Sequence, residues 1–196
     1  MLKVTLDTNI IVDLEQNNEW APYLKELIQM RKNREINLRI VAMSASERKP
    51  KGTDLCNFSV FKERINRIGL SDVEILKPIC YWDVSFWEYC IWSDKVMLQL
   101  EEDIHKILFP TIEFNYSKYC KHQGLIEKTE DICGKWVNRK CDVLIMWCHI
   151  WYKGDVFVTR DKQFFKETKK PLLEKLGAKE ILCPAEAVSR LREHTN

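Results

Sequence analysis

Apolar residues occur along this chain in two alternating patterns, short uninterrupted runs and repeats at helical spacing. The short runs, bounded by polar or turn-forming residues, predict buried strands at 3–6, 38–42, 73–76, 156–159 and 181–182. The helical repeats, ended by Gly or Pro in several places, predict helices at 10–15, 22–32, 58–67, 84–108, 125–138, 142–152, 162–176 (interrupted near Pro171) and 184–192. Strands that alternate with helices are typical of a parallel sheet covered on both faces.

Length and composition limit the class of protein. A chain of 196 residues can bury one sizeable core, so we expect a single domain over 1–196. A net charge of only +2 does not by itself indicate a nucleic-acid partner. Basic residues nevertheless gather at 31–51 and 160–179. These two stretches are either solvated helix faces or surfaces that contact phosphate groups.

Several classes of protein and site are excluded by missing motifs. The N-terminus carries no apolar core of a signal peptide, and the apolar run at 143–152 is too short to span a bilayer. We therefore expect a cytoplasmic protein with no membrane partner. The eight cysteines include no C-x-x-C pair, so buried free thiols are expected rather than a zinc site. No glycine-rich phosphate loop and no nucleophile elbow are present.

Four carboxylates stand at positions where strands end or helices begin. Asp7 follows the strand at 3–6, Asp161 follows the strand at 156–159, Glu47 follows the second strand, and Asp142 opens a predicted apolar helix. The carboxyl ends of parallel strands form the ligand-binding edge of an open sheet. Carboxylates that converge there repel one another, and a divalent cation such as Mg²⁺ or Mn²⁺ reverses that balance.

Each of these acids also has a local interpretation. Asp7 and Asp142 can be helix N-caps, and Asp161 can be a turn residue. N-caps are common, so the local interpretation competes strongly for any single acid. It explains the whole set less well. A metal held by these carboxylates would activate water and neutralise charge on a phosphodiester during in-line displacement.

Three segments together resemble the PIN domain nucleases, a family that includes the VapC-type toxins. They are Asp7-Thr8-Asn9 with the apolar residues after it, the segment 142–145 that starts with Asp142, and the segment 156–164 that contains Thr159-Arg160-Asp161. The resemblance covers about residues 1–48 and 125–190. It implies a three-layer α/β/α sandwich with a mainly parallel central sheet. It also implies divalent-metal-dependent cleavage of RNA.

The resemblance implies a role for each matching residue. Asp7, Asp142 and Asp161 would bind Mg²⁺ or Mn²⁺, while Asn9 and Thr159 would orient Asp7 and the metal-bound waters through hydrogen bonds. Glu47 matches the second acid of the family. That match is poorer because Pro50, three residues later, disfavours a regular helix; the acids that could substitute for Glu47 are Glu35 and Asp54. Asp13 fits the family's helix and fits a solvated helix residue equally well.

The chain departs from the family in a helical, aromatic-rich insertion at about 50–123. Trp82, Trp87 and Trp92 recur every five residues, a spacing that does not keep to one helix face. Such side chains stack on unpaired bases or, more commonly, fill a core or a subunit interface. His149 also departs from the family pattern, and we expect a core or interface histidine there rather than a ligand.

Two classes of function follow from these observations. The first is a metal-dependent endoribonuclease acting on single-stranded RNA, with salt-sensitive binding through the basic stretches. It would be either a toxin with an antitoxin partner or an orphan nuclease, and analogy with the family suggests a homodimer. The alternative is a non-catalytic module that uses the same scaffold to bind RNA or a protein. A phosphatase with an Asp nucleophile is disfavoured because Asn9 stands where a second Asp is usual.

Overall fold

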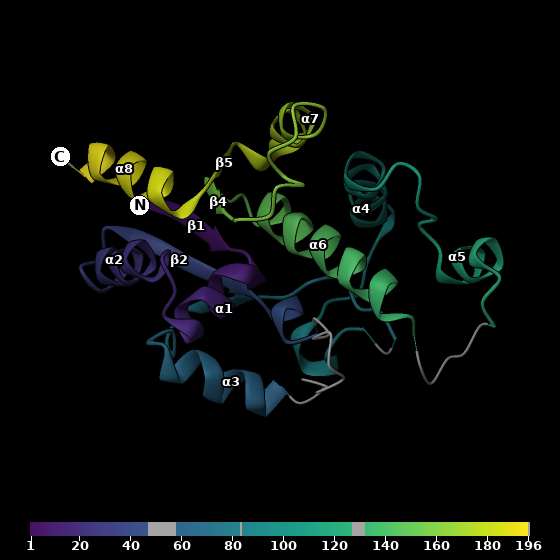
Figure 1. Ribbon diagram of the computed structural model, residues 1–196, viewed down its shortest axis with the longest axis horizontal. Coiled ribbons are helices and arrows are strands. Elements are labelled where there is room, and N and C mark those ends of the chain that lie inside the picture. Colours follow the sequence, from purple (N-terminus) through teal and green to yellow (C-terminus); the bar gives the residue numbers. More distant parts are fainter. Residues whose placement is uncertain (47–57, 83, 127–131, 196) are drawn as a thin grey trace.

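A five-stranded, fully parallel sheet forms the centre of the protein (Figure 1). The computed structural model describes residues 1–46, 58–82, 84–126 and 132–195. The strand order is β3-β2-β1-β4-β5. The strands are β1 (Leu2–Leu6), β2 (Ile36–Val41), β3 (Glu74–Leu76), β4 (Val156–Val158) and β5 (Glu180–Leu182). All five agree with the predicted strands to within two residues at each end, because buried parallel strands are continuous apolar runs.

Helices cover both faces of the sheet, which confirms the predicted three-layer α/β/α sandwich. One face packs on α1 (Thr8–Gln16), α2 (Ala21–Lys32), α3 (Phe58–Arg67) and α8 (Pro184–Thr195). The other face packs on α6 (Gly134–Trp151), which is flanked by α4 (Lys95–Leu108), α5 (Tyr116–Gln123) and α7 (Lys170–Leu173). Alternate strand residues feed the two cores: Val4 and Val158 lie in the first, and Phe157 lies in the second.

The strand order places β1 beside β4, although about 150 residues separate them in the sequence. The chain runs from β1 outward to β2 and β3, then crosses to the other side to form β4 and β5. The sheet therefore changes direction of growth between β1 and β4. In open parallel sheets the crevice outside the carboxyl ends of the strands at this switch point is the usual ligand site.

The predicted long helix at 84–108 is wrong in its first half. Only Lys95–Leu108 is helical, and Asp94 caps that helix by accepting a hydrogen bond from the Met97 backbone N–H at 2.8 Å. The preceding residues form a loop that contains a short 3₁₀ turn, η2 (Trp87–Tyr89). A parallel bridge between Ile79 and Ile91 holds this loop in place. Long-range backbone pairing thus replaces the helix that local spacing favours.

Three other predicted helices have different limits. The helix around Asp142 begins much earlier, at Gly134, so Asp142 lies in its middle and is not an N-cap. Helix α5 was not predicted; Asn115 caps its start, and Gly124 ends it in the left-handed region. Within the predicted helix at 125–138, residues 134–138 form the start of α6, and residues 127–131 lie outside the described part of the chain. The predicted helix at 162–176 starts only at Lys170, because Pro171 is accommodated in a first turn.

The segment at about 50–123, expected as a helical insertion, also contributes a strand to the central sheet. Its residues Glu74–Leu76 form β3, which pairs with β2 and completes one edge of the central sheet. Helix α3, from the same segment, packs against the β1 and β2 side of the core through Phe61 and Ile65. This segment is therefore partly an integral portion of the sandwich. The rest of the segment consists mainly of α4, α5 and the loop between Cys80 and Cys90. This loop carries Trp82 and Trp87 and is called the tryptophan-bearing loop below.

His149 is the core histidine that the sequence predicts, and it predicts a pH dependence of stability. Its buried ring places Nε2 at 2.8 Å from the Ala178 carbonyl oxygen, while Nδ1 has no hydrogen-bond partner and faces Gly154. Burial, which penalises the imidazolium, lowers the pKa of His149 to about 4. The neutral form therefore stabilises the fold above the unfolded pKa of about 6.5, and this contribution is lost as the pH falls towards 4.

We expect the free energy of unfolding, measured with urea, to fall by up to about 3 kcal/mol more in the wild type than in His149→Gln between pH 6.5 and 4. The comparison with the variant removes the contribution of the many carboxylates that titrate in the same range. His122→Gln, at an exposed position, should retain the wild-type pH dependence. Equal slopes for wild type and His149→Gln would contradict the assignment.

Candidate active site

Asp7 lies at the carboxyl end of β1, where it is 3% exposed and accepts three hydrogen bonds. Its Oδ1 accepts from the Thr8 backbone N–H at 2.7 Å, which makes it the N-cap of α1. Its Oδ2 accepts from the Thr159 hydroxyl and from the Asn9 amide, both at 2.5 Å. Three donors around one buried side chain stabilise the ionised carboxylate.

Asn9 links the ends of β1 and β4. Its Nδ2 also lies 3.1 Å from Oγ1 of Thr159, and its Oδ1 accepts a hydrogen bond from the Arg160 backbone N–H at 3.1 Å. The hydrogen bonds that the family resemblance implies from Asn9 and Thr159 to Asp7 are therefore present. The arrangement fixes both the position and the rotamer of the Asp7 carboxylate.

Asp161 reaches the same place from β4. Its backbone N–H donates to Oγ1 of Thr159 at 3.0 Å, so Asp7 and Asp161 are both attached to the Thr159 hydroxyl. Its Oδ1 accepts from the Gln163 backbone N–H at 2.8 Å, and the side chain is half-buried. From the residues that the structure describes, Oδ2 of Asp161 receives no hydrogen bond. That oxygen is available for a ligand.

The local interpretations of Asp7 and Asp161 hold alongside this geometry. Asp7 caps a helix and Asp161 closes a turn, as the sequence allowed. Each of these roles uses only one carboxylate oxygen, and a carboxylate has lone pairs enough for several partners. Capping by itself does not require that the two acids share Thr159. A local role and a ligand role are compatible for both residues.

Asp142 lies on the face of the sheet that α6 covers, half-buried in the middle of that helix. The end of α6 is near the start of β4, where the Asp155 backbone N–H pairs with the Lys3 carbonyl oxygen at 2.8 Å. Nine helical residues back from Trp151 rise about 14 Å. Four strand residues from Lys3 to Asp7 rise about 13 Å. Because these two distances are similar, we expect Asp142 to lie near the edge of the sheet at which the strands reach their carboxyl ends.

Asp13 and Arg160 form an ion pair next to this site that the sequence analysis missed. Asp13 is fully buried, and both of its oxygens accept from the Arg160 guanidinium, with Nη2 at 2.7 Å from Oδ1. Asn18 donates to Oδ1 as well, at 2.6 Å. The interpretation of Asp13 as a solvated helix residue is therefore wrong. The feature of the sequence that could have indicated burial of Asp13 is its position in the same apolar helix as Asn9.

Of the remaining proposed acids, the structure describes only Glu35. Glu47 and Asp54 lie outside the residues that the structure describes. Glu35 immediately precedes β2, at the edge where strands begin, and accepts a hydrogen bond from Asn33. It stands at the edge opposite Asp7, which excludes it as a substitute for Glu47.

Only part of the basic surface lies at the site. Arg39 is buried within the sheet, where its guanidinium donates to Thr5 Oγ1 and the Tyr152 carbonyl oxygen, so it contacts no phosphate. Three further cations, Arg31, Lys32 and Arg34, line a hollow at the opposite edge. The two exposed lysines that follow Asp161 most closely are Lys162 and Lys166. The described cations of the stretch 31–51 therefore do not lie at the acids, while Arg48, Lys49 and Lys51 lie outside the described residues.

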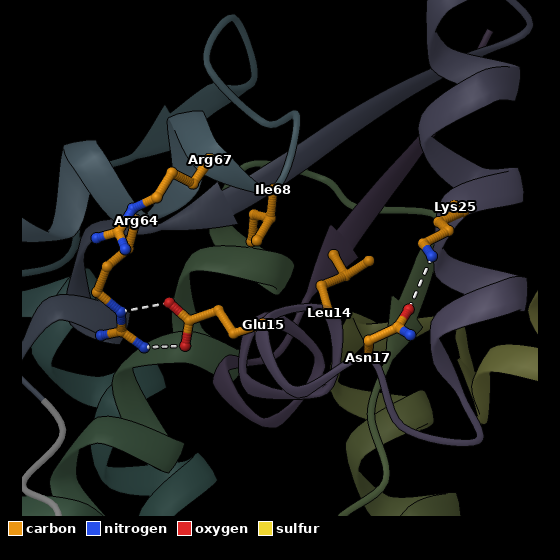
Figure 2. Close-up of a pocket in the computed structure, with 7 residues that line it drawn as sticks. All are labelled: Leu14, Glu15, Asn17, Lys25, Arg64, Arg67 and Ile68. Atoms are coloured by element: carbon orange, nitrogen blue, oxygen red, sulfur yellow. Dashed lines mark hydrogen bonds and ion pairs between the residues drawn. The ribbon is translucent and has the colours of Figure 1, made fainter.

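A separate hollow of about 610 Å³ lies between α1, α2 and α3 (Figure 2). Arg64 lies across it from Glu15, bonded to both carboxylate oxygens at 2.5 and 2.6 Å. On the other side of Glu15, Lys25 donates to Asn17 at 2.8 Å. Neither Asp7 nor Asp161 lines this hollow. Arg64 and Glu15 neutralise each other there, so the hollow is distinct from the carboxylate site in both place and chemistry.

The donor chemistry of the site suits a hard divalent cation, since it consists of carboxylate and hydroxyl oxygens. Within the described ranges, no group of three or more carboxylate, histidine or cysteine side chains is close enough to hold a metal ion by itself. Mg²⁺ commonly binds through one or two carboxylates and completes its shell with water and substrate phosphate. Asp7 and Asp161 fit that type of site.

Comparison with known proteins adds no relative. Among the described residues, no helix is long and apolar enough to cross a membrane. No family model, no curated protein and no solved structure matches the chain.

Proposed function

We propose that the protein is a divalent-metal-dependent endoribonuclease of the PIN type, which hydrolyses phosphodiester bonds in single-stranded RNA. One observation carries the proposal: at the switch point of the sheet, the Thr159 hydroxyl donates to the Asp7 carboxylate and accepts from the Asp161 backbone N–H, which places the two acids at the carboxyl ends of neighbouring strands. A second argument supports it, because the rise per residue puts Asp142 about as far along α6 from the start of β4 as Asp7 lies along β1 from Lys3. The family resemblance of these same segments supplies the reaction class.

In this proposal Asp7 and Asp161 would hold Mg²⁺ or Mn²⁺, because no third acid is grouped closely with them among the described residues; a ligand role of Asp142 stays a prediction of the resemblance. When bound, the metal supplies an activated water and neutralises negative charge on the phosphodiester. Thr159 and Asn9 hold the Asp7 carboxylate in one orientation through the hydrogen bonds described above. The exposed Lys162 and Lys166 contact phosphates of the bound strand.

The neighbouring ion pair has a positioning role in the same proposal. Arg160 is fixed by the buried Asp13 carboxylate, and its backbone N–H is bound to Asn9. Because Arg160 lies between Thr159 and Asp161, these contacts restrain the backbone that carries both residues. The pair thus limits the separation between the carboxylates of β1 and β4.

A non-catalytic module that binds RNA or a protein partner is the second candidate, and one observation favours it. Trp82, Trp87 and Trp92 are 78%, 62% and 76% exposed. The Trp87 ring contacts both others, with its centroid 5.5 Å from that of Trp82 and 5.6 Å from that of Trp92. Exposed tryptophans provide stacking surfaces for bases and anchors for protein partners. Binding by these rings would not require Asp7 or Asp161.

Cleavage of a 5′-labelled single-stranded RNA tests the proposal. We expect endonucleolytic fragments with Mn²⁺ or Mg²⁺ and none in EDTA, because carboxylates alone do not activate water sufficiently. The same sequence annealed to its complement should be cut much more slowly. RNA that is bound but left intact with either metal would favour the non-catalytic module.

The cytoplasmic location, an antitoxin or other protein partner, and a homodimer stay predictions.

A further inference from the structure

Cys80 and Cys90 are placed against each other at the base of the tryptophan-bearing loop. Their Sγ atoms lie 2.7 Å apart, with Cys90 as the hydrogen-bond donor. The adjacent backbone is already paired, since the Cys80 N–H donates to the Ile91 carbonyl oxygen and the Ile91 N–H donates to that of Pro78, both at 2.9 Å. The two sulfur atoms are thus held together by the fold and not only by side-chain rotamers.

The loop between the two cysteines has further internal support. Ser85 Oγ accepts from the Tyr81 N–H and donates to the Ile79 carbonyl oxygen, both at 3.0 Å. The loop carries Trp82 and Trp87, and Trp92 follows it directly. A covalent bond at its base therefore requires little backbone movement and would fix the part of the chain that presents these rings.

We propose that Cys80 and Cys90 form an intramolecular disulfide bond, which makes the pair a site of oxidative modification that closes the tryptophan-bearing loop. The oxidant is a small-molecule disulfide such as oxidised glutathione. The Cys80 thiolate attacks one glutathione sulfur, which forms a mixed disulfide and releases one glutathione. Cys90 then loses its proton to water and attacks the Cys80 sulfur, which releases the second glutathione. Two protein thiols lose two electrons, and one glutathione disulfide gains them.

The surroundings of the two sulfurs determine the order of these steps. Both side chains are half-buried, so a small reagent can reach them. Burial raises the pKa of Cys90 to about 12, with a further contribution from its hydrogen bond to Cys80. Cys90 therefore remains a thiol at neutral pH and is the poorer initial nucleophile. Its proximity suits it to the second, intramolecular step.

This pair differs from the other cysteines that the structure describes. Cys120, Cys141 and Cys148 are buried free thiols, as the sequence predicts. Burial raises the pKa of Cys148 well above its usual range, so it stays protonated and unreactive. The described contacts bring only Cys80 and Cys90 into sulfur-to-sulfur contact.

Peptide mapping of the full-length chain tests the proposal directly. The native protein is equilibrated with an excess of oxidised over reduced glutathione at fixed pH, quenched with acid, alkylated and digested with trypsin. Because Pro78 blocks cleavage after Lys77, residues 68–95 form one peptide that contains Cys80 and Cys90 and no other cysteine. We expect this peptide to lack two hydrogens and to carry no alkyl group.

Three controls make the result decisive. The closed peptide should be at least about tenfold more abundant from folded than from urea-unfolded protein, because the fold brings the sulfurs together. Cys90→Ser should retain glutathione on Cys80, because the second step is lost. Cys183→Ser, at another half-buried cysteine, should close the loop as the wild type does. Two alkyl groups on the wild-type peptide, glutathione adducts on it, or equal closure in urea would each overturn the proposal.

Discussion

Replacing Asp161 with asparagine is expected to lower the rate of RNA cleavage at least about a hundredfold while leaving the protein folded. The substitution removes a negative charge from the proposed metal site. It keeps an oxygen that can accept the hydrogen bond from the Gln163 backbone N–H, so the turn after β4 is preserved. Initial rates on labelled single-stranded RNA at saturating Mn²⁺, with circular dichroism as the test of folding, measure the effect.

Asp161→Asn is a better test than Asp7→Asn. An amide at position 7 would direct its NH₂ group at donors from Thr8, Asn9 or Thr159, so loss of activity would be mixed with loss of stability. Asp72→Asn is the matched control, because it makes the same change of charge at an exposed position just before β3, at the opposite edge. If Asp161→Asn cleaves as fast as Asp72→Asn, the proposed carboxylate site is not catalytic.

The second large effect is expected from Lys140→Met, which should lower the free energy of unfolding by about 3–5 kcal/mol. Lys140 and Glu101 form a buried ion pair at 2.6 Å between α6 and α4, and the Tyr81 hydroxyl donates to the same carboxylate at 2.6 Å. The Lys140 ammonium also lies 4.0 Å from the ring centroid of Phe114. Removal of the lysine leaves Glu101 buried without its counter-ion. Urea unfolding at pH 7 measures the loss.

A double variant separates the charge effect from a packing effect. Lys140→Met with Glu101→Met replaces the pair by two apolar side chains of similar volume, so much of the lost stability should return. Lys106→Met is the surface control. It breaks an exposed pair with Glu102 on the same helix, and it should change stability little. A Lys140→Met protein as stable as the wild type would contradict a stabilising role of the buried ion pair.

The predicted fold came from features that are local in the sequence. Uninterrupted apolar runs identified all five strands, and the polar residues after two of them identified Asp7 and Asp161. Helix limits failed where a distant partner decides the structure. The residues after Val84 have helical spacing, but pairing of Ile79 with Ile91 and the cap at Asp94 exclude the helix there.

The charged interior of the protein was the other part that the sequence could not supply. Arg39 counts as a surface cation in any inspection of composition, yet it lies opposite Thr5 in the sheet and is almost fully buried. Asp13 and Arg160 are 147 positions apart, so no local pattern connects them. Such pairs depend on which strands become neighbours. That information emerges only when the strand order is known.

The hydroxyl of Thr159 has a consequence for when the proposed site is assembled during synthesis. It joins Asp7 to a part of the chain 152 residues later, so neither half of the site has its final geometry before β4 docks beside β1. During synthesis the ribosome releases β1 first and β4 last but one among the strands. A nascent chain therefore carries Asp7 for most of its translation without a partner acid. The proposed nuclease would therefore stay inert beside its own messenger RNA until translation is nearly complete.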